Sequence, residues 1–389
     1  MGNAVKFIEL YKNKTFKEFP YCISDILVFS LLSYANIEDK INDKQHDYEN
    51  DLIPLKKFYD DKYKEYISNR FLVPKEFANF FKKAIESKRY SHIKITKILN
   101  VFSEEHKVQF FAFTIVIDEC VFVLFRGTDR TINGWKENFD MVLQDKIPSQ
   151  KIGAKYLKEV IDRFDGKKII VIGHSKGGNI AYYSYFNLSL EDQNKVTYTF
   201  NLDGPGFKED NYDYKDYGAK YLKIVPEDDV IGILFDVTQR HKIVKCNKVG
   251  FYAHDVLTWQ LDRKTNYTTL LETKELTFYS DILRYSMYLY YRNLDPVTIK
   301  ILVEFIIDII DQSKTKDVLM LARDVIKFAP KYIKEIKENN KEQSDFIIKQ
   351  VKNFIKVYFY CATHYKEVKT EFNQGHPSLL ISKINNGAN

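Results

Sequence analysis

The spacing of apolar residues changes twice along the chain and divides it into three regions. In residues 1–90, apolar residues recur at the spacing of an α-helix, as in the run Phe77, Phe80, Phe81 and Ile85. This first region is therefore predicted to be a mostly helical N-terminal segment.

Between residues 93 and 250, apolar and β-branched residues form short continuous runs that predict β-strands. The expected strands, the first two of them joined as a hairpin, cover residues 109–117, 120–125, 168–172, 196–202, 221–225 and 242–246. A helical pattern at 150–165 and a second one after residue 178 separate some of these runs. Strands that alternate with helices predict a mostly parallel central sheet of the α/β class.

Beyond about residue 275 the helical spacing returns. The apolar stripes there comprise Ile299, Leu302, Val303, Ile306, Ile309 and Ile310, then Val318, Leu321, Ala322, Val325 and Ile326, then Ile347, Val351, Phe354, Ile355 and Tyr358. We interpret the stripes as core, with a partner-binding surface as the alternative. The expected division is a domain at 1–280 and a helical C-terminal region at 281–389.

Composition excludes several classes of protein. Of the 389 residues, 45% are hydrophobic and the formal net charge is +6, which gives a globular core and no basic stripe for nucleic acid. The four cysteines lie far apart, which excludes a zinc ribbon. The polar start and the lack of an apolar run of about 20 residues predict a cytoplasmic protein without a transmembrane segment. No motif for a metal or a cofactor occurs, so none is expected.

Residues 173–177 carry the strongest chemical signal in the sequence. Their sequence, Gly-His-Ser-Lys-Gly, matches the nucleophile elbow of serine hydrolases and lies between an apolar strand and a helix. Such a turn exposes Ser175 at the N-terminus of the helix, where N–H groups stabilise a developing oxyanion. The alternative is a glycine-rich turn in which Ser175 only caps the helix.

The partners of Ser175 follow from chain order, because the acid and then the histidine come after the serine in this type of site. His254 is the expected base, since His241 opens a strand and His364 and His376 lie in the helical tail. Asp229, which follows the strand at 221–225, is the expected acid. Asp228 is the alternative acid, and both aspartates could simply cap a short helix.

The oxyanion hole is expected to use two backbone N–H groups. One belongs to Lys176, directly after the serine, and the other to Thr128, in the loop after the strand at 120–125. Arg126 in the same loop is expected to form a structural ion pair. Residues 129–135 are a candidate lid over the site.

Several segments together resemble a known family. They are Phe125–Thr128, Trp135, Gly173–Gly178, Asp229-Val230, Tyr252–His254 and Asp203–Phe207. The chain is similar to the lipase class 3 branch of the α/β-hydrolases, and within it to a bacterial Mbeg-like group of unknown function. The resemblance implies an α/β-hydrolase fold and a Ser175–Asp229–His254 triad. It covers most of residues 1–280 and, more loosely, the helical tail.

The chain departs from that family pattern at two positions. Lys176 stands where class 3 lipases usually have an apolar residue, which favours an anionic or polar substrate unless the side chain extends to water or meets an acid at 208–217. Asn138 stands where they usually have an acid. We therefore expect hydrolysis of a small-molecule carboxylic ester rather than of a triglyceride. A thioesterase, an amidase, an acyltransferase and a non-catalytic interaction module are the alternatives.

Overall fold

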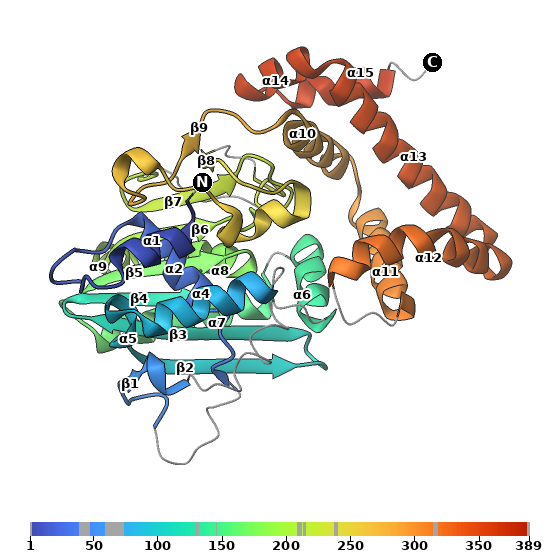
Figure 1. Cartoon of the computed structure of the whole chain (residues 1–389). Helices are drawn as coiled ribbons and strands as arrows, with labels where there is room; N and C mark the ends of the chain where they lie inside the picture. The colour runs from blue at the N-terminus through green and yellow to red at the C-terminus, as the bar shows by residue number, and fades with distance from the viewer. Residues whose placement is uncertain are drawn as a thin grey trace. The chain divides into compact units, whose positions relative to one another are not determined.

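The computed structural model describes residues 2–38, 47–58, 74–128, 132–144, 146–207, 212, 215–236, 240–313 and 318–386. The chain forms two compact units, Met1–Leu276 and Thr277–Asn389. Figure 1 shows the sheet in the first unit and only helices in the second. Within the described residues, no helix combines the length and the apolar character needed to cross a membrane.

The first unit is built on a sheet that has nine strands in the described residues, lying side by side in sequence order. The strands are β1 Ile53–Pro54, β2 Lys94–Ser103, β3 Val108–Ile117, β4 Cys120–Phe125, β5 Lys168–His174, β6 Val196–Leu202, β7 Tyr221–Pro226, β8 Lys242–Val244 and β9 Glu272–Thr273. Strands β4 to β8 are parallel, whereas β1 to β4 and the β8–β9 pair are antiparallel. The sheet is therefore mixed. The expected parallel sheet exists only in its central part, because antiparallel strands extend both edges.

Strands β4 and β5 are apolar along most of their length because both faces of the sheet are covered. In β5, Ile170 and Ile172 pack into one core, and Ile169 and Val171 pack into the other. The same alternation occurs along β4. Continuous apolar runs are typical of parallel strands buried on two sides.

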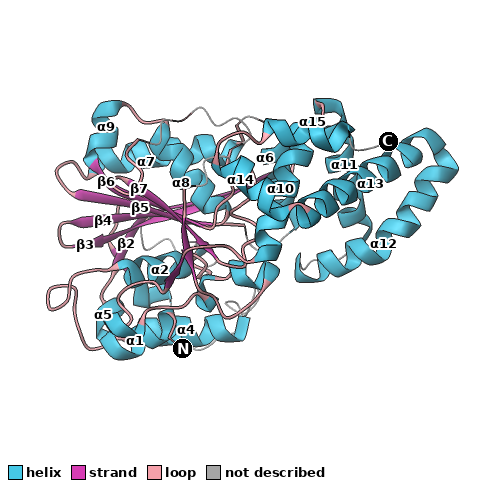
Figure 2. Cartoon of the chain, turned by 90° about the horizontal axis from the view of Figure 1, so that it is seen from above, coloured by secondary structure: helices cyan, strands magenta, loops and turns pink. Residues whose placement is uncertain are grey.

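Helices from different parts of the chain form the two covering layers, as Figure 2 shows. One layer contains α7 Pro148–Arg163, α8 Lys176–Phe186 and α9 Leu190–Lys195, which connect parallel strands. Sequential parallel strands with right-handed crossovers place these helices on one face. The other layer comes from the N-terminal segment, with α1 Ala4–Tyr11, α2 Ile23–Leu32, α4 Pro74–Glu86 and α5 Lys88–Ser91. In its described residues, which leave out 39–46 and 59–73, this segment is mostly helical, as predicted, and also contains β1 and the 3₁₀ turn η2 at Leu55–Phe58.

A buried ion pair fixes the N-terminal layer. Arg89 donates to both carboxylate oxygens of Asp25, at 2.8 and 2.7 Å, and both side chains are fully buried. Tyr90 donates to the same carboxylate at 2.6 Å. Burial of both charges with these hydrogen bonds specifies how the segment packs.

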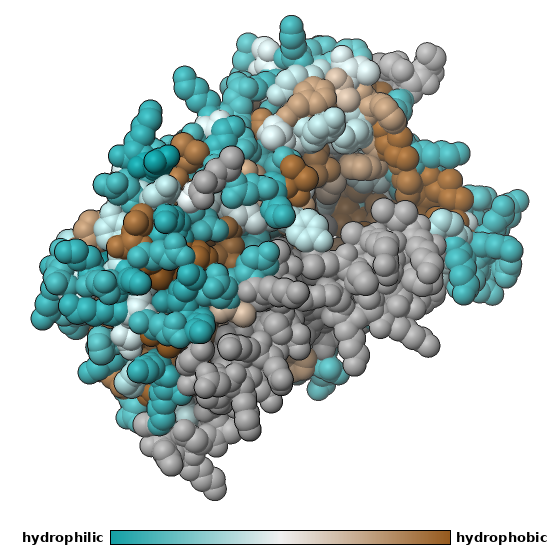
Figure 3. Space-filling view, in the orientation of Figure 1, coloured by the Kyte–Doolittle hydropathy of each residue, from teal (hydrophilic) through white to brown (hydrophobic). Residues whose placement is uncertain are grey.

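The second unit is helical in its described residues, as the sequence predicts. Its helices are α10 Phe278–Arg292, α11 Pro296–Ser313, α12 Val318–Asn339, α13 Lys341–Thr363, α14 Tyr365–Asn373 and α15 Ser378–Asn386. Ile299, Val303 and Ile309 are buried, but Val351 and Ile355 of the third expected stripe are nearly half exposed. The prediction that this stripe is core is therefore wrong at those two residues. Figure 3 shows apolar surface on the helices of this unit.

Candidate active site

Ser175 lies in a strained turn between β5 and α8. Its backbone has φ 58° and ψ −131°, a conformation that costs a non-glycine residue about 1–3 kcal/mol. Both flanking glycines are required by close backbone contacts. A Cβ on Gly173 would lie 1.9 Å from the oxygen of Gly177, and one on Gly177 would lie 2.1 Å from that of Phe125. This is the local geometry that the sequence motif predicts for an exposed nucleophile.

His254 lies at the end of a 3₁₀ turn, η3 Gly250–His254, and its side chain is almost fully buried. Its ring Nδ1 is 2.6 Å from Oδ2 of Asp203, which is completely buried. Burial lowers the pKa of His254 to about 4, so the ring is neutral at neutral pH. A neutral ring that donates from Nδ1 to a carboxylate keeps the lone pair of Nε2 free to act as a base.

The carboxyl group that meets His254 is thus Asp203, and the prediction that Asp229 or Asp228 makes this hydrogen bond is wrong. The reason lies in the register of the sheet. His174 of β5 is level with Leu202 of β6, so Ser175 and Asp203 are neighbours at the ends of adjacent strands. Chain order allowed Asp203, which stands between the serine and the histidine, but the acid was assigned to the wrong strand.

Asp229 is still part of the same buried group of side chains. It is fully buried, and its Oδ1 accepts from the N–H groups of Ile231 at 2.7 Å and Gly232 at 2.9 Å. Its carboxyl group also interacts with that of Asp203. Asp228 is only half-buried.

His174, which the sequence analysis did not assign, supports the base. Its ring is 4.6 Å from the ring of His254, centroid to centroid, and its Nε2 lies 2.9 Å from the backbone oxygen of His254. Burial lowers the pKa of His174 well below its usual value, so the ring is neutral. A carbonyl oxygen only accepts, so Nε2 carries the hydrogen, and Nδ1 accepts from the Tyr34 hydroxyl at 2.6 Å.

The hydroxyl of Ser175 does not complete the predicted chain of hydrogen bonds. Within the described part of the chain, Ser175 Oγ forms no hydrogen bond to His254, although a bond of about 3 Å was expected. Both residues lie at the carboxyl end of the parallel strands, because His174 precedes Ser175 and contacts the ring of His254.

The expected oxyanion donors lie beside Ser175. A Cβ on Gly127 would be 2.8 Å from Cβ of Ser175, so the loop that carries Thr128 passes directly against the nucleophile. The Thr128 hydroxyl donates to Oδ1 of Asn138 at 2.9 Å. Lys176 is the first residue of α8, and its N–H therefore has no acceptor within that helix.

Arg126 forms the expected structural ion pair. Its guanidinium group donates to both carboxylate oxygens of Glu38, at 3.1 and 2.5 Å, and lies 3.9 Å from the ring centre of Phe111. The candidate lid falls largely outside the described residues. Residues 129–131 are not described, and for 132–135 only the backbone of α6 (Ile132–Leu143) is.

The side chain of Lys176 points away from a substrate. It is 1% exposed, and its Nζ lies 2.7 Å from Oε2 of Glu137 and 2.6 Å from the backbone oxygen of Gln109. Glu137 is itself fully buried and also accepts from Ser149. The prediction that Lys176 faces an anionic substrate, or else water, is therefore wrong, because an acid on α6 takes up its charge.

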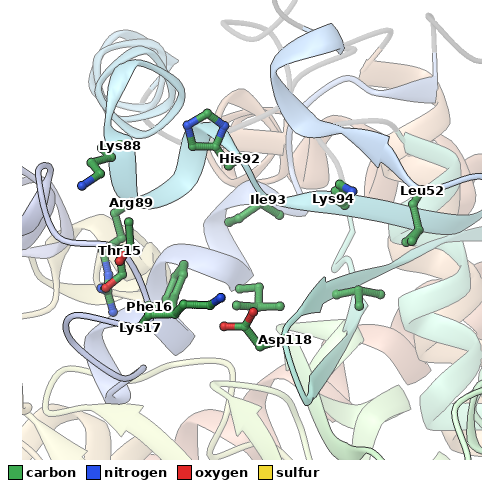
Figure 4. Close-up of a pocket in the computed structure, with 12 residues that line it drawn as sticks. Thr15, Phe16, Lys17, Leu52, Lys88, Arg89, His92, Ile93, Lys94 and Asp118 are labelled. Carbon is green, nitrogen blue, oxygen red and sulfur yellow. The ribbon is translucent and has the colours of Figure 1, made fainter.

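Figure 4 shows one cavity of about 440 Å³ in the first unit, whose lining does not include Ser175, His254 or Asp203. It is lined by Lys17, Lys88, Lys94, Asp118 and their neighbours. Asp118 belongs to the turn before β4, at the amino end of the parallel strands, whereas Ser175 follows their carboxyl end. This cavity is therefore separate from the candidate active site.

Comparisons with known proteins point to one family. A family model described as Mbeg1-like matches residues 84–308. No relative is found among curated proteins.

Solved structures of fungal lipases show only a distant likeness. A triacylglycerol lipase from Penicillium expansum is 12% identical, with 47% of this chain and 81% of that one covered and a TM-score of 0.28. A Rhizomucor miehei lipase with its propeptide is 13% identical, with 58% of this chain and 68% of that one covered and a TM-score of 0.31. The Lip2 lipase from Yarrowia lipolytica is 12% identical, with 62% of this chain and 86% of that one covered and a TM-score of 0.32.

Proposed function

The chain belongs to the Mbeg1-like family, and from this premise we propose that it is a serine hydrolase that cleaves a carboxylic ester. The observation that carries the proposal is the arrangement at the carboxyl end of β5 and β6. Ser175 occupies the strained turn, and beside it Asp203 accepts the hydrogen bond that fixes the tautomer and orientation of the buried His254 ring. A turn that only capped a helix would need neither the strain nor the buried histidine–carboxylate pair.

In the proposed reaction, Ser175 Oγ attacks the ester carbonyl carbon while Nε2 of His254 takes the hydroxyl proton. Asp203 stabilises the imidazolium ion that forms. His254 then gives the proton to the leaving alkoxide, which departs as the alcohol and leaves an acyl-enzyme. In the deacylation step, a water molecule attacks the acyl carbon while His254 takes one of its protons. His254 returns this proton to Ser175 Oγ as the acyl–serine bond breaks, and the carboxylic acid is released.

The proposed oxyanion hole consists of the N–H groups of Thr128 and Lys176. The Thr128 hydroxyl is engaged with Asn138, so Asn138 holds the loop in the place where related enzymes use an acid. The ion pair between Lys176 and Glu137 fixes the residue after the nucleophile from the other side. Donors held in this way do not have to reorganise when charge develops on the carbonyl oxygen.

A second candidate is a hydrolase fold that serves as a non-catalytic interaction module. The observation that favours it is the missing hydrogen bond between Ser175 and His254 within the described residues. Catalytic hydrogen bonds are often long in the absence of substrate and form in the substrate complex. The first candidate therefore requires Oγ to turn toward Nε2 when an ester binds.

A fluorophosphonate probe distinguishes the two candidates, because it reacts only with an activated serine. We expect the wild-type protein to be labelled and to hydrolyse p-nitrophenyl esters. Ser175→Ala should abolish labelling and lower kcat by a factor on the order of 10⁴–10⁶. The matched control is Ser189→Ala, at an exposed serine that caps α9. Labelling of Ser175→Ala at the wild-type level, or none of the wild type, would refute the proposal.

A further inference from the structure

The buried carboxyl groups of Asp203 and Asp229 lie close to each other, and that of Asp203 binds His254. Asp203 follows β6, and Asp229 lies three residues beyond the end of β7. A Cβ on Gly232 would lie 2.3 Å from Oδ1 of Asp203 and 2.9 Å from Oδ2 of Asp229. The two oxygens therefore border the same small space, which only a glycine leaves open.

The hydrogen bonds described for these carboxyl groups use one oxygen of each. Asp229 Oδ1 accepts from the N–H groups of Ile231 and Gly232, and Asp203 Oδ2 pairs with His254. Asp203 Oδ1 is buried and meets no donor of good geometry among the described residues. The space beside Gly232 that Oδ1 of Asp203 and Oδ2 of Asp229 both border brings the two carboxyl groups close enough to shift each other's pKa. Two ionised carboxylates cannot hydrogen-bond to each other, because neither has a hydrogen to donate.

We propose that Asp203 and Asp229 share one proton, and that Asp229 is a positioning residue that donates this proton to Oδ1 of Asp203. The remaining negative charge then lies on Asp203, against His254. The catalytic meaning of this pair rests on the proposed function, but the shared proton does not.

The surrounding charges assign the proton to Asp229. Burial and the charge of Asp203 raise the pKa of Asp229 well above its usual value, whereas burial raises that of Asp203 only to about 7. Lys223 of β7 favours ionisation of both, but its ammonium group is engaged by Asp236 at 3.0 Å and by the backbone oxygen of Gly232. Like charges that are this close favour one proton on the pair.

The shared proton would fix the plane of the Asp203 carboxylate. Asp203 has φ 53°, in the left-handed region of backbone conformations. With Oδ1 held by Asp229, Oδ2 points at Nδ1 of His254, at 2.6 Å. His254 is thus oriented by the ionised Asp203, which is itself held by the neutral Asp229.

Isosteric variants test this assignment. Asp229→Asn keeps Oδ1 for its two backbone donors and places an NH₂ group where the shared proton would be. It should lower kcat/KM by less than about 10-fold, and Asp229→Ala by more, since only the amide can donate to Asp203. Asp203→Asn should cost about 10³- to 10⁴-fold, since an amide at Nδ1 favours the wrong tautomer. Asp228→Asn, at the neighbouring half-buried position, is the matched control and should match the wild type.

Infrared spectroscopy tests the proton without any assay of activity. The difference spectrum of wild type minus Asp229→Asn at about pH 8 should show one carboxylic-acid band, which an ionised Asp229 would not give. Lack of this band, or equal losses of kcat/KM for Asp229→Asn and Asp203→Asn, would overturn the proposal. If the wild type neither hydrolyses esters nor reacts with the probe, the proposed function fails, and the infrared result still decides on the shared proton.

Discussion

Lys176 and Glu137 form a buried ion pair next to the nucleophile, and its removal should destabilise the first unit strongly. Loss of one partner from such a pair costs about 3–5 kcal/mol, because it leaves an uncompensated charge out of water. The surroundings in this protein rank the two variants. Lys176→Met leaves the Glu137 carboxylate with N–H donors from Gln109 and Ser149 and with the Ser149 hydroxyl, at 3.1, 3.2 and 2.6 Å. We expect a cost of about 3 kcal/mol for this variant.

Glu137→Gln should cost more, about 4–5 kcal/mol. In this variant the charged ammonium group of Lys176 keeps the backbone oxygen of Gln109 as an acceptor, but it faces a neutral amide in place of the Glu137 carboxylate. The double variant Lys176→Met with Glu137→Gln removes both charges, so its cost should be smaller than the sum of the single costs by about 2 kcal/mol or more.

Denaturant unfolding followed by tryptophan fluorescence measures these costs, because both tryptophans, Trp135 and Trp259, belong to the first unit. Single variants that each lose less than about 1 kcal/mol, or costs that simply add, would refute the assignment of a buried, coupled pair. Lys176→Leu should also leave the ratio of kcat/KM for an anionic and a neutral ester unchanged. A shift in that ratio would show that the side chain reaches the substrate.

Two further predictions follow from the site. Gly127→Ala places a methyl group 2.8 Å from Cβ of Ser175 and 2.6 Å from the backbone oxygen of His174. The variant should therefore displace an oxyanion donor and lower kcat by about 10²–10³. Ester hydrolysis at the wild-type rate would contradict this prediction. Burial raises the pKa of Asp203 to about 7, so the folded protein retains a proton that the unfolded chain has released. The free energy of unfolding of the wild type relative to Asp203→Asn should therefore fall between about pH 4 and pH 7 by up to about 1.4 kcal/mol per pH unit, and urea titrations that show a constant or rising difference would exclude it.

The sequence predicted those parts of the site that depend on local backbone geometry. A glycine pattern between an apolar strand and a helix is enough to place Ser175, because only the adjacent residues create that turn. Chain order reduced the eight histidines to four candidates for the base, and the expected strand and helical tail favoured His254 among these four. The central strands were predicted for a similar reason, since burial on both faces leaves a continuous apolar run.

Features that depend on the register between distant segments were not predicted. Asp203 lies beside Ser175 only because of the register in which β5 and β6 pair. The residues of the two strands do not reveal this register. Lys176 was expected to face the site because Glu137, 39 residues away, could not be recognised as its partner. The outermost strands β1 and β9 were not predicted, because each is only two residues long.

The hydrogen bond from Tyr34 to His174 extends the candidate site beyond the stretch that the family model matches. Tyr34 follows α2, which the buried pair of Asp25 and Arg89 joins to α5, whereas the family model matches only residues 84–308. The matched stretch therefore contains Ser175 and His254, the proposed nucleophile and base, but not the hydroxyl group that binds His174. A chain trimmed to its most similar region would keep the catalytic motifs and lose part of their scaffold. The candidate site therefore includes a residue, Tyr34, that lies outside the stretch matched by the family model.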